Sequence, residues 1–304
     1  MIERESQIVL GLDPDPGSLW PGSDAPREAR PGPGELTPAQ AAAAAIVEHC
    51  RALIDATAEA CVAVKLQLAR FELLGAPGWV ALESVAAHAR RSGLLVIADA
   101  KRGDIDVTAG AYAAGLIGGA DTPFGRLEGL GADLVTVNPL MGRDAIEPFV
   151  AAARAAGAGV LVLVRTSNPG AADIEDLALA GEGTVWERIA AIVDELGRGG
   201  IGECGLSDVG AVVGATEPQH LARARELMGA APFLLPGVGA QGGRVEDLAP
   251  AFAPGRAGGL VTASRSIAGA YRTLGGEPAA AARAAAEGLR ESAWALSELA
   301  LRAG

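Results

Sequence analysis

The sequence predicts an α/β protein whose strands close into a (β/α)8 barrel, the architecture known as the TIM barrel. Short apolar runs rich in β-branched residues recur eight times, and alanine-rich segments of helical period alternate with them. Continuous apolar strands separated by helices are typical of a parallel sheet that is covered by other elements. Eight strand–helix units is the count of a closed barrel.

In chain order, the runs predicted as strands are residues 8–12, 61–66, 94–98, 134–137, 160–164, 210–214, 233–235 and 259–263. The segments predicted as helices are residues 38–59, 77–92, 106–118, 143–156, 184–197, 218–228, 244–251 and 266–273. Residues 278–302 are expected to form a closing amphipathic helix. No shift in composition marks a boundary, so residues 1–304 are predicted to form a single domain.

The connecting segments agree with this architecture. A doubly wound open sheet is the alternative, but it needs a GxGxxG turn after its first strand, where this chain reads Asp-Pro-Asp-Pro-Gly. Thr37 followed by Pro38 is typical of a helix N-terminus. Residues 14–36 lack periodicity and are expected to form a long first loop whose role the sequence does not assign, and residues 119–131 a glycine-rich insertion.

The charge balance excludes several classes of protein. The chain has 37 acidic and 25 basic residues and a formal net charge of −12, whereas nucleic-acid binding requires clustered lysine and arginine. Half of the residues are hydrophobic, which is too many for a disordered chain. No apolar run approaches the roughly 20 residues that span a bilayer. We expect no nucleic-acid partner, no membrane segment and, from a start without a signal pattern, a cytoplasmic location.

The cysteines and histidines do not indicate a metal site. Cys50, Cys61 and Cys204 are scattered and lack CxxC spacing, which argues against a disulfide framework and a zinc site. The three histidines fall in or near predicted helices, and we interpret them as structural or surface residues.

Only two of the 25 basic residues are lysines, Lys65 and Lys101. Arginine can replace lysine on a solvated surface, but only an ammonium can give up a proton, so these positions are candidates for chemistry. In a parallel barrel the active site lies at the carboxyl ends of the strands, and both lysines lie there. The other residues expected at these ends are Asp13, Gln67, Asp99, Asn138, Arg165, Thr166, Ser167, Thr216, Pro236, Gly237, Ser264 and Arg265.

Asp99 and Lys101 carry the clearest chemical signal. Residues two apart on a strand point to the same side, here toward the mouth of the barrel, and Lys65 is expected beside them. Asp104 stands at the opening of the next helix and is not expected to fold back onto Lys101 of its own chain. Neighbouring carboxylates would hold each ammonium protonated. The alternative is a buried ion-pair layer that closes the barrel, although such layers stabilise proteins weakly.

The last two strand ends predict a phosphate site. Residues 236–243 (PGVGAQGG) offer backbone amides after the seventh strand, and Arg265 stands at the start of the helix after the eighth. Barrels commonly bind phosphate between these two loops, and an arginine at a helix N-terminus is disfavoured unless an anion binds there. The alternative is a plain glycine-rich connection beside an exposed arginine.

Three further strand ends have roles that the residues leave open. Residues 165–170 (RTSNPG) supply hydroxyl and amide groups that could bind a polar ring or form a capped turn. Residues 138–144 (NPLMGRD) allow the same two interpretations. Asp13 could accept hydrogen bonds from sugar hydroxyls, or it could cap the turn that follows it.

Taken in order, these residues resemble one family. The segment from Asp99 to Thr108 (DAKRGDIDVT) looks like the DxKxxD signature of orotidine 5'-phosphate decarboxylases, and residues 236–243 and 264–267 resemble the phosphate loops of that family. The motifs shared with the longer form of that enzyme are GLDP near the start, VKxQ at 64–67, NPxMGRD at 138–144 and RTSNPG at 165–170.

The resemblance implies a homodimeric (β/α)8 barrel that converts orotidine 5'-phosphate to UMP and carbon dioxide in pyrimidine biosynthesis, without a metal or organic cofactor. By position it implies a catalytic array of Lys65, Asp99 and Lys101 that Asp104 of the partner subunit completes. The substrate-binding residues that it implies are Asp13 at the ribose, Ser167 at the pyrimidine, Pro236, Gln241 and Arg265 at the phosphate, and Ile105 and Thr108 across the interface.

Three alternatives share parts of this pattern. The DxKxxD motif also occurs in related sugar-phosphate decarboxylases and synthases, which would need Mg²⁺. One lysine could act as the nucleophile of a Schiff-base aldolase, although neighbouring aspartates disfavour the neutral amine that this reaction requires. A phosphate-binding barrel without activity would bind UMP analogues and would not turn them over.

Overall fold

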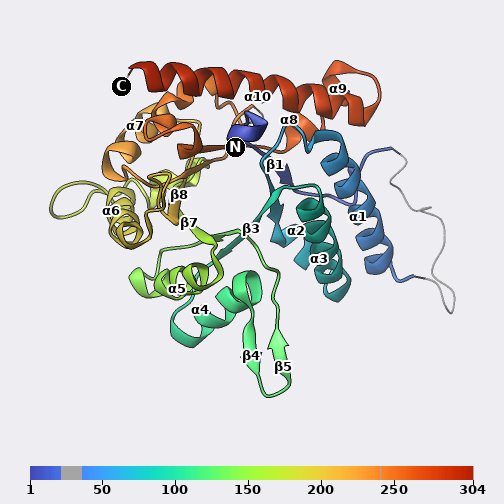
Figure 1. Cartoon of the computed structure of the whole chain (residues 1–304), viewed down its shortest axis with the longest axis horizontal. Helices are drawn as coiled ribbons and strands as arrows, with labels where there is room; N and C mark the ends of the chain where they lie inside the picture. The colour runs from blue at the N-terminus through green and yellow to red at the C-terminus, as the bar shows by residue number, and fades with distance from the viewer. Residues whose placement is uncertain (22–35, 240, 304) are drawn as a thin grey trace.

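The computed structural model describes residues 1–21, 36–239 and 241–303, and it contains a closed barrel of eight parallel strands (Figure 1). These strands are β1 (Ile8–Leu12), β2 (Ala63–Gln67), β3 (Leu95–Arg102), β6 (Leu134–Val137), β7 (Gly159–Arg165), β8 (Val209–Val213), β9 (Phe233–Leu235) and β10 (Gly259–Ala263). β10 closes the barrel by pairing in parallel with β1. The predicted TIM barrel is confirmed, and all eight predicted strands are present.

Helices cover the outside of the barrel. The α-helices that precede the C-terminal one are α1 (Pro38–Thr57), α2 (Leu68–Glu72), α3 (Ala76–Arg91), α4 (Asp106–Ala113), α5 (Glu147–Ala156), α6 (Val185–Gly197), α7 (Pro218–Leu227), α8 (Arg265–Ala268) and α9 (Tyr271–Leu274). The expected cap of α1 is present, because the Thr37 hydroxyl accepts the Gln40 amide at 3.3 Å and the Gln40 side chain accepts the Thr37 amide at 2.9 Å. This reciprocal pair satisfies two amides that the helix leaves free.

Four predicted helices differ from the observed ones. The helix expected over 143–156 begins as a 3-10 helix, Arg143–Ala145, and α5 starts only at Glu147. The helix expected over 106–118 continues from α4 into a turn of π-helix, Ala114–Gly118. The helix expected over 244–251 is a 3-10 helix, η6 (Val245–Phe252), with Pro250 inside it. A proline has no amide hydrogen to donate, which disfavours a continuous α-helix there. The helix expected over 266–273 is divided into α8 and α9.

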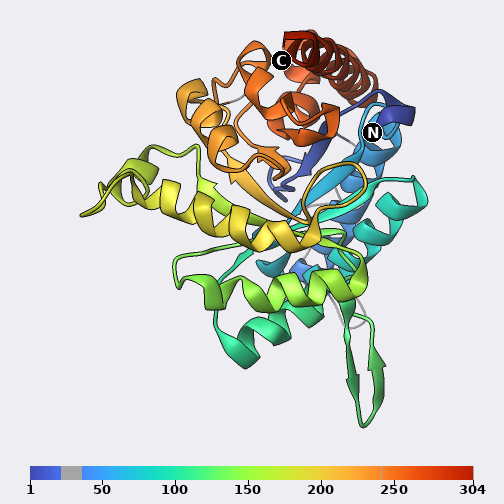
Figure 2. The same ribbon diagram turned by 60° about the vertical axis from the view of Figure 1, so that its left-hand side comes forward.

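A β-hairpin outside the barrel was not predicted. Its strands, β4 (Ala120–Thr122) and β5 (Gly125–Leu127), pair in antiparallel fashion within the segment expected to be a glycine-rich insertion. Figures 1 and 2 show the hairpin projecting away from the barrel, beyond α4. Each strand has three residues and none of them is buried, so no alternation of apolar and polar residues marks the hairpin in the sequence.

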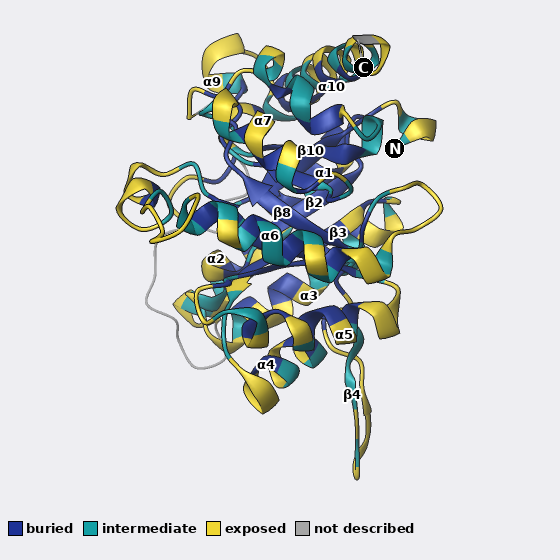
Figure 3. Cartoon of the chain, turned by 90° about the vertical axis from the view of Figure 1, so that its left-hand side faces the viewer, coloured by how far each residue is buried: buried dark blue, intermediate teal, exposed yellow. Residues whose placement is uncertain are grey.

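Apolar side chains fill the inside of the barrel. The buried members of this inner cluster are Val9, Val62, Ala63, Ile97, Leu161, Val212, Leu234 and Leu260. A second and larger cluster lies between the strands and the helices, so the strands are buried on both faces, as the blue strands in the centre of Figure 3 show. Since side chains alternate along a strand, the residue two positions after an inner one also points inward.

The C-terminal segment forms the predicted helix, α10 (Pro278–Ala303), which packs against α1 and η6. It runs along one side of the barrel and passes the N-terminus (Figure 1). Much of the predicted first loop lies in residues 22–35, outside the described residues. Among the helices that the structure describes, none is both long and apolar enough to cross a membrane. The single domain and the cytoplasmic location stay predictions.

Candidate active site

On four barrel strands, a polar side chain follows an apolar one by two residues, so both point into the barrel. The pairs of apolar and polar residues are Ala63 and Lys65 on β2, Ile97 and Asp99 on β3, Leu134 and Thr136 on β6, and Leu260 and Thr262 on β10. All four polar residues are buried. Thr136 and Thr262 were not predicted, because they lie within strands and not at strand ends. The inward parity of each strand is the signal that could have found them.

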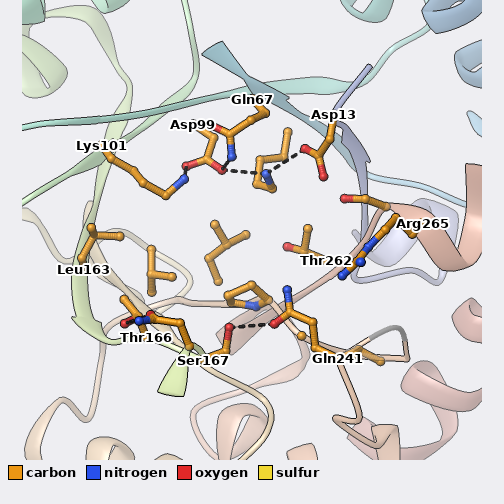
Figure 4. Close-up of a pocket in the computed structure, with 18 of the residues that line it drawn as sticks. Asp13, Gln67, Asp99, Lys101, Leu163, Thr166, Ser167, Gln241, Thr262 and Arg265 are labelled. Atoms are coloured by element: carbon orange, nitrogen blue, oxygen red, sulfur yellow. Dashed lines mark hydrogen bonds and ion pairs between the residues drawn. The ribbon is translucent and has the colours of Figure 1, made fainter. Parts of the chain in front are cut away.

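Three of these side chains, Lys65, Asp99 and Thr262, border a cavity of about 480 Å³ at the carboxyl end of the barrel. The predicted site residues that line it are Asp13, Lys65, Asp99, Lys101, Ser167, Pro236, Gln241 and Arg265. Figure 4 shows Lys101, Asp99 and Asp13 along one side of the cavity, with Gln241 and Ser167 on the opposite side. The ion pairs therefore face an open cavity and do not form a sealed layer across the barrel.

Asp99 is the centre of the charged array. Its Oδ2 atom lies 2.6 Å from the Lys65 ammonium and accepts a hydrogen bond from Gln67 at 3.1 Å. Its Oδ1 atom lies 2.5 Å from the Lys101 ammonium. The Lys65 ammonium also lies 3.6 Å from Asp13. The predicted neighbourhood of Lys65, Asp99 and Lys101 is therefore present within one chain.

The array changes the proton affinities of its members. Burial alone would raise the pKa of Asp99, but the positive charges of Lys65 and Lys101 outweigh it and lower that pKa to about 2. Burial would lower the pKa of Lys65, yet the charges of Asp99 and Asp13 reverse the direction and raise it. At neutral pH the Asp99 carboxylate is therefore ionised and the Lys65 amine is protonated.

Lys101 reaches the cavity from an irregular part of β3. Its backbone has a φ of +48°, in the left-handed region that residues other than glycine seldom adopt. The pairing of β3 with β6 is also irregular, because Ala98 pairs with Val135 and Arg102 with Val137. Asp99 and Lys101 therefore meet through a bulge, and not through the regular alternation that we expected from their spacing.

Three predicted site residues do not line the cavity of their own chain. These residues are Asp104, Ile105 and Thr108. The Asp104 carboxylate accepts the Ile105 amide at 2.8 Å, and α4 begins only at Asp106. Ile105 is 48% exposed, and Thr108 is also exposed. The expectation that Asp104 does not fold back onto Lys101 agrees with this geometry.

The predicted phosphate loops meet at the far end of the cavity from Lys101. Arg265 begins α8 and has an exposed side chain that lines the cavity (Figure 4). In the loop after β9, Gly237 has a φ of +104°, a conformation that favours glycine. The Gln241 side chain accepts a hydrogen bond from the Ser167 hydroxyl at 2.9 Å. This bond joins the loop after β9 to the loop after β7 along one side of the cavity.

The loop after β7 lies over the cavity and is fixed by a buried arginine. Arg165 donates to both carboxylate oxygens of Asp176, at 2.8 and 2.9 Å. Glu175, which was not predicted, lines the cavity and accepts hydrogen bonds from the Thr166 amide and hydroxyl at 2.8 and 2.9 Å. Of the two interpretations of residues 165–170, the structure favours the one in which they border a site.

Residues 138–144 have a different role. The Asn138 side chain accepts the Leu140 amide at 3.0 Å, which closes a local turn. None of these residues lines the cavity. Within the described residues, no group of three or more histidine, cysteine, aspartate or glutamate side chains gathers as metal ligands would.

Comparisons with known proteins confirm the family that the motifs resemble. The family model described as "Orotidine 5'-phosphate decarboxylase / HUMPS family" matches residues 6–285. A protein of Deinococcus radiodurans named orotidine 5'-phosphate decarboxylase is 46% identical over 240 residues, which cover 79% of this chain and 81% of the relative. A protein of the same name from Rhodopirellula baltica is 40% identical over 275 residues, which cover 90% of this chain and 86% of the relative.

A solved structure extends the likeness to three dimensions. The OMP decarboxylase of Leishmania donovani superimposes with a TM-score of 0.70 at 32% sequence identity, and the match covers 98% of this chain and 96% of the other. The family match spans all eight barrel strands and every residue of the charged array. From the matched sequence and the matched fold together, the chain belongs to the orotidine 5'-phosphate decarboxylase / HUMPS family.

Proposed function

We propose that this chain decarboxylates orotidine 5'-phosphate to UMP in pyrimidine biosynthesis, without a metal or organic cofactor. One observation carries the proposal most directly. An array of Lys65, Asp99 and Lys101 stands on one side of a cavity whose far end holds Arg265 and Gln241. The names of the relatives from Deinococcus radiodurans and Rhodopirellula baltica support the same reaction.

The charged array suits the chemistry of this substrate. When the bond between C6 and the carboxylate carbon breaks, carbon dioxide leaves and the electron pair stays on C6, in the plane of the ring, where resonance cannot spread it. A fixed ammonium lowers the energy of this charge as it develops. In the proposed mechanism Lys101 stabilises the carbanion and then donates its proton to C6, which gives UMP, and solvent returns a proton to the amine.

Asp99 and Lys65 prepare Lys101 for this step. The Asp99 carboxylate lies 2.5 Å from the Lys101 ammonium and holds it at the edge of the cavity. Lys65 keeps Asp99 ionised, as the lowered pKa of that carboxyl indicates. A carboxylate near the departing carboxylate also disfavours the bound substrate more than the transition state, in which that charge is leaving.

The other end of the cavity suits the ribose and the phosphate. Asp13 is positioned to accept hydrogen bonds from ribose hydroxyls, because it lines the cavity and its side chain is 34% exposed. Arg265 and Gln241, with the backbone of Pro236 and Gly237, are proposed to bind the phosphate. Ser167 would then bind the pyrimidine from the loop after β7.

We further propose that two chains complete each other's sites. Asp104, Ile105 and Thr108 lie outside the cavity of their own chain. A homodimer that presents Asp104 of the partner subunit to Lys101 would complete an alternating Lys–Asp–Lys–Asp array. The exposed side chains of Ile105 and Val107 beside it support a contact surface at this place, since apolar residues there would otherwise face water.

The reaction is tested by mixing purified protein with orotidine 5'-phosphate and following the loss of its ultraviolet absorbance. We expect the absorbance to fall, UMP to appear in equal amount and the rate to be unchanged by EDTA. No loss of absorbance at micromolar enzyme would overturn the proposal.

Three parallel assays identify the alternatives. Turnover of a sugar phosphate that requires Mg²⁺ and stops with EDTA would indicate the related metal-dependent enzymes. Trapping of a carbonyl substrate by borohydride would indicate a Schiff-base aldolase. Binding of UMP without any turnover would indicate a phosphate-binding barrel.

A further inference from the structure

A buried threonine lies directly behind the charged array. Thr136 is on β6 and is 1% exposed. Its hydroxyl donates to Oδ1 of Asp99 at 2.9 Å and accepts the backbone amide of Lys101 at 2.9 Å. One oxygen atom therefore contacts the side chain of one member of the array and the backbone of another.

These bonds occur where the barrel ladder is interrupted. Ala98 pairs with Val135 and Arg102 pairs with Val137, so the three residues from Asp99 to Lys101 all lie opposite Thr136. In a regular parallel pair, backbone carbonyls would accept the amides of such residues. At this bulge the Thr136 hydroxyl accepts the Lys101 amide in place of a carbonyl.

The bulge also holds Lys101 in an unfavourable backbone conformation. Its φ of +48° lies in the left-handed region, which is unfavourable for a residue with a β-carbon. Such a conformation persists only where the surroundings enforce it. The hydrogen bond from the Lys101 amide to Thr136 is one direct contact that does so.

The orientation of the Asp99 carboxylate depends on the same hydroxyl. Oδ2 interacts with Lys65 and Gln67, and Oδ1 interacts with Lys101 and Thr136. Of these four partners, only Thr136 lies on β6, the strand that pairs with β3 on the side away from β2. Without it, Oδ1 would keep only one partner, the Lys101 ammonium, whose side chain is 44% exposed.

From this geometry we infer that Thr136 is a positioning residue, which fixes the bulge of β3 and the Asp99 carboxylate so that the Lys101 ammonium stands at the reacting carbon. The inference rests on the proposed decarboxylation for its kinetic consequence. Its structural consequence, a Lys101 amide held by the Thr136 hydroxyl, does not depend on any reaction. Thr136 itself does not line the cavity.

The structural consequence can be measured because the chain has only two lysines. Protein labelled with ¹⁵N-lysine should give two backbone amide signals, which Lys65→Arg assigns. We expect the Lys101 amide of the wild type to exchange slowly with solvent. In Thr136→Val, which keeps the shape of the side chain and removes the hydroxyl, this signal should shift and exchange faster. Thr136→Ser should restore both properties.

The kinetic consequence is measured with the same variants on orotidine 5'-phosphate. A displacement of about 1 Å in a reacting group can lower a rate about 100-fold, so we expect Thr136→Val to lower kcat by about 10- to 100-fold. KM should change by less than about threefold, since the phosphate and ribose contacts remain. Thr136→Ser should recover most of kcat.

A matched control separates positioning from stability. Thr57 is also 1% exposed, but its hydroxyl donates to the Leu53 carbonyl within α1, at 2.8 Å, and is not bonded to the charged array. Thr57→Val should therefore change neither the Lys101 amide nor kcat, even where it lowers the melting temperature.

The outcomes distinguish this inference from the proposed function. An unchanged Lys101 amide in Thr136→Val, or an unchanged kcat in an active protein, would overturn the role of Thr136. If the wild type does not turn over orotidine 5'-phosphate, the proposed function fails, while the amide measurement still decides whether Thr136 holds the bulge. A Thr136→Ser variant that behaves as Thr136→Val would also contradict the inference.

Discussion

At the scale of single residues, the two lysines and one aspartate form a compact electrostatic unit. Asp99 lies between Lys65 and Lys101, and each of its oxygens is within 2.6 Å of an ammonium. An arginine could satisfy the same charge, but its guanidinium stays protonated and cannot deliver a proton. Arginine is used at the proposed phosphate position, Arg265, where only charge and hydrogen bonds are required. In the proposed mechanism, lysine stands where a proton is donated and arginine where only an anion is bound.

His49 provides a prediction about stability. Burial lowers the pKa of its imidazole from 6.5 to about 4, and its Nδ1 atom accepts the Trp20 amide at 3.2 Å. Between pH 6.5 and pH 4 the unfolded chain binds a proton that the folded chain does not, so stability decreases as the pH falls through this range. The loss is at most roughly 3 kcal/mol for a shift of this size.

We expect His49→Asn, whose side-chain oxygen can also accept the Trp20 amide, to reduce this acid sensitivity. The measurement is urea unfolding at several pH values between 7.5 and 4. The free energy of unfolding at pH 7.5 serves as the control. A difference between the two proteins at this pH reports lost packing, because the imidazole is uncharged there. An equal loss of stability toward acid in both proteins would contradict the assignment to His49.

At the scale of elements, the loop after β7 depends on an ion pair that lies beneath it. Arg165 is 5% exposed and donates to Asp176 through two nitrogens, and it also lies 3.5 Å from Glu217. The same loop presents Ser167 and Glu175 to the cavity. Removing one partner of a buried ion pair leaves the other charge unpaired and costs about 3–5 kcal/mol.

We therefore expect Arg165→Met to lower the stability by an amount of this order and to raise KM for orotidine 5'-phosphate more than it lowers kcat. Arg154→Met is the matched control, because Arg154 also contacts both oxygens of an aspartate, Asp208, but at the surface. Exposed pairs contribute about 0–1 kcal/mol. Thermal melting and steady-state kinetics of both variants check the contrast, and equal effects would contradict it.

The elements also explain which features could be predicted from the sequence. The eight barrel strands are apolar on both faces, and this burial marks them in the sequence. The bulge in β3 could not be predicted, because it depends on the pairing of Ala98 and Arg102 with a strand that is distant in the sequence. The β4–β5 hairpin was missed because its residues do not alternate between a buried and an exposed face.

At the scale of the whole molecule, the barrel brings distant segments into one cavity. Lys65 and Arg265, which are 200 positions apart, both line it. These residues could be predicted because the carboxyl ends of all strands in a parallel barrel meet at one face. Thr136, Glu175 and Thr262 could not be found from strand ends. Glu175 follows the end of β7 by ten positions in the sequence, and its hydrogen bonds to Thr166 place it beside that strand end in the fold.

The proposed dimer predicts that two inactive variants restore activity when they are mixed. Lys101→Ala and Asp104→Ala should each be inactive alone. If Asp104 acts across the interface, a mixed dimer has one intact site, so refolding equal amounts of the two variants should restore about a quarter of the wild-type activity, given random pairing into C2 dimers. Activity of the mixture no higher than that of either variant would place Asp104 in its own chain's site.

The proton-donating role of Lys101 is the central claim. The most direct test is the rate of UMP formation from orotidine 5'-phosphate by the wild type and by Lys101→Arg, measured at the same pH. Because the guanidinium keeps the charge and cannot give up a proton, we predict that the variant loses at least about 10³-fold in kcat, within the range that general acid catalysis contributes. A Lys101→Arg variant with nearly wild-type kcat would contradict the account.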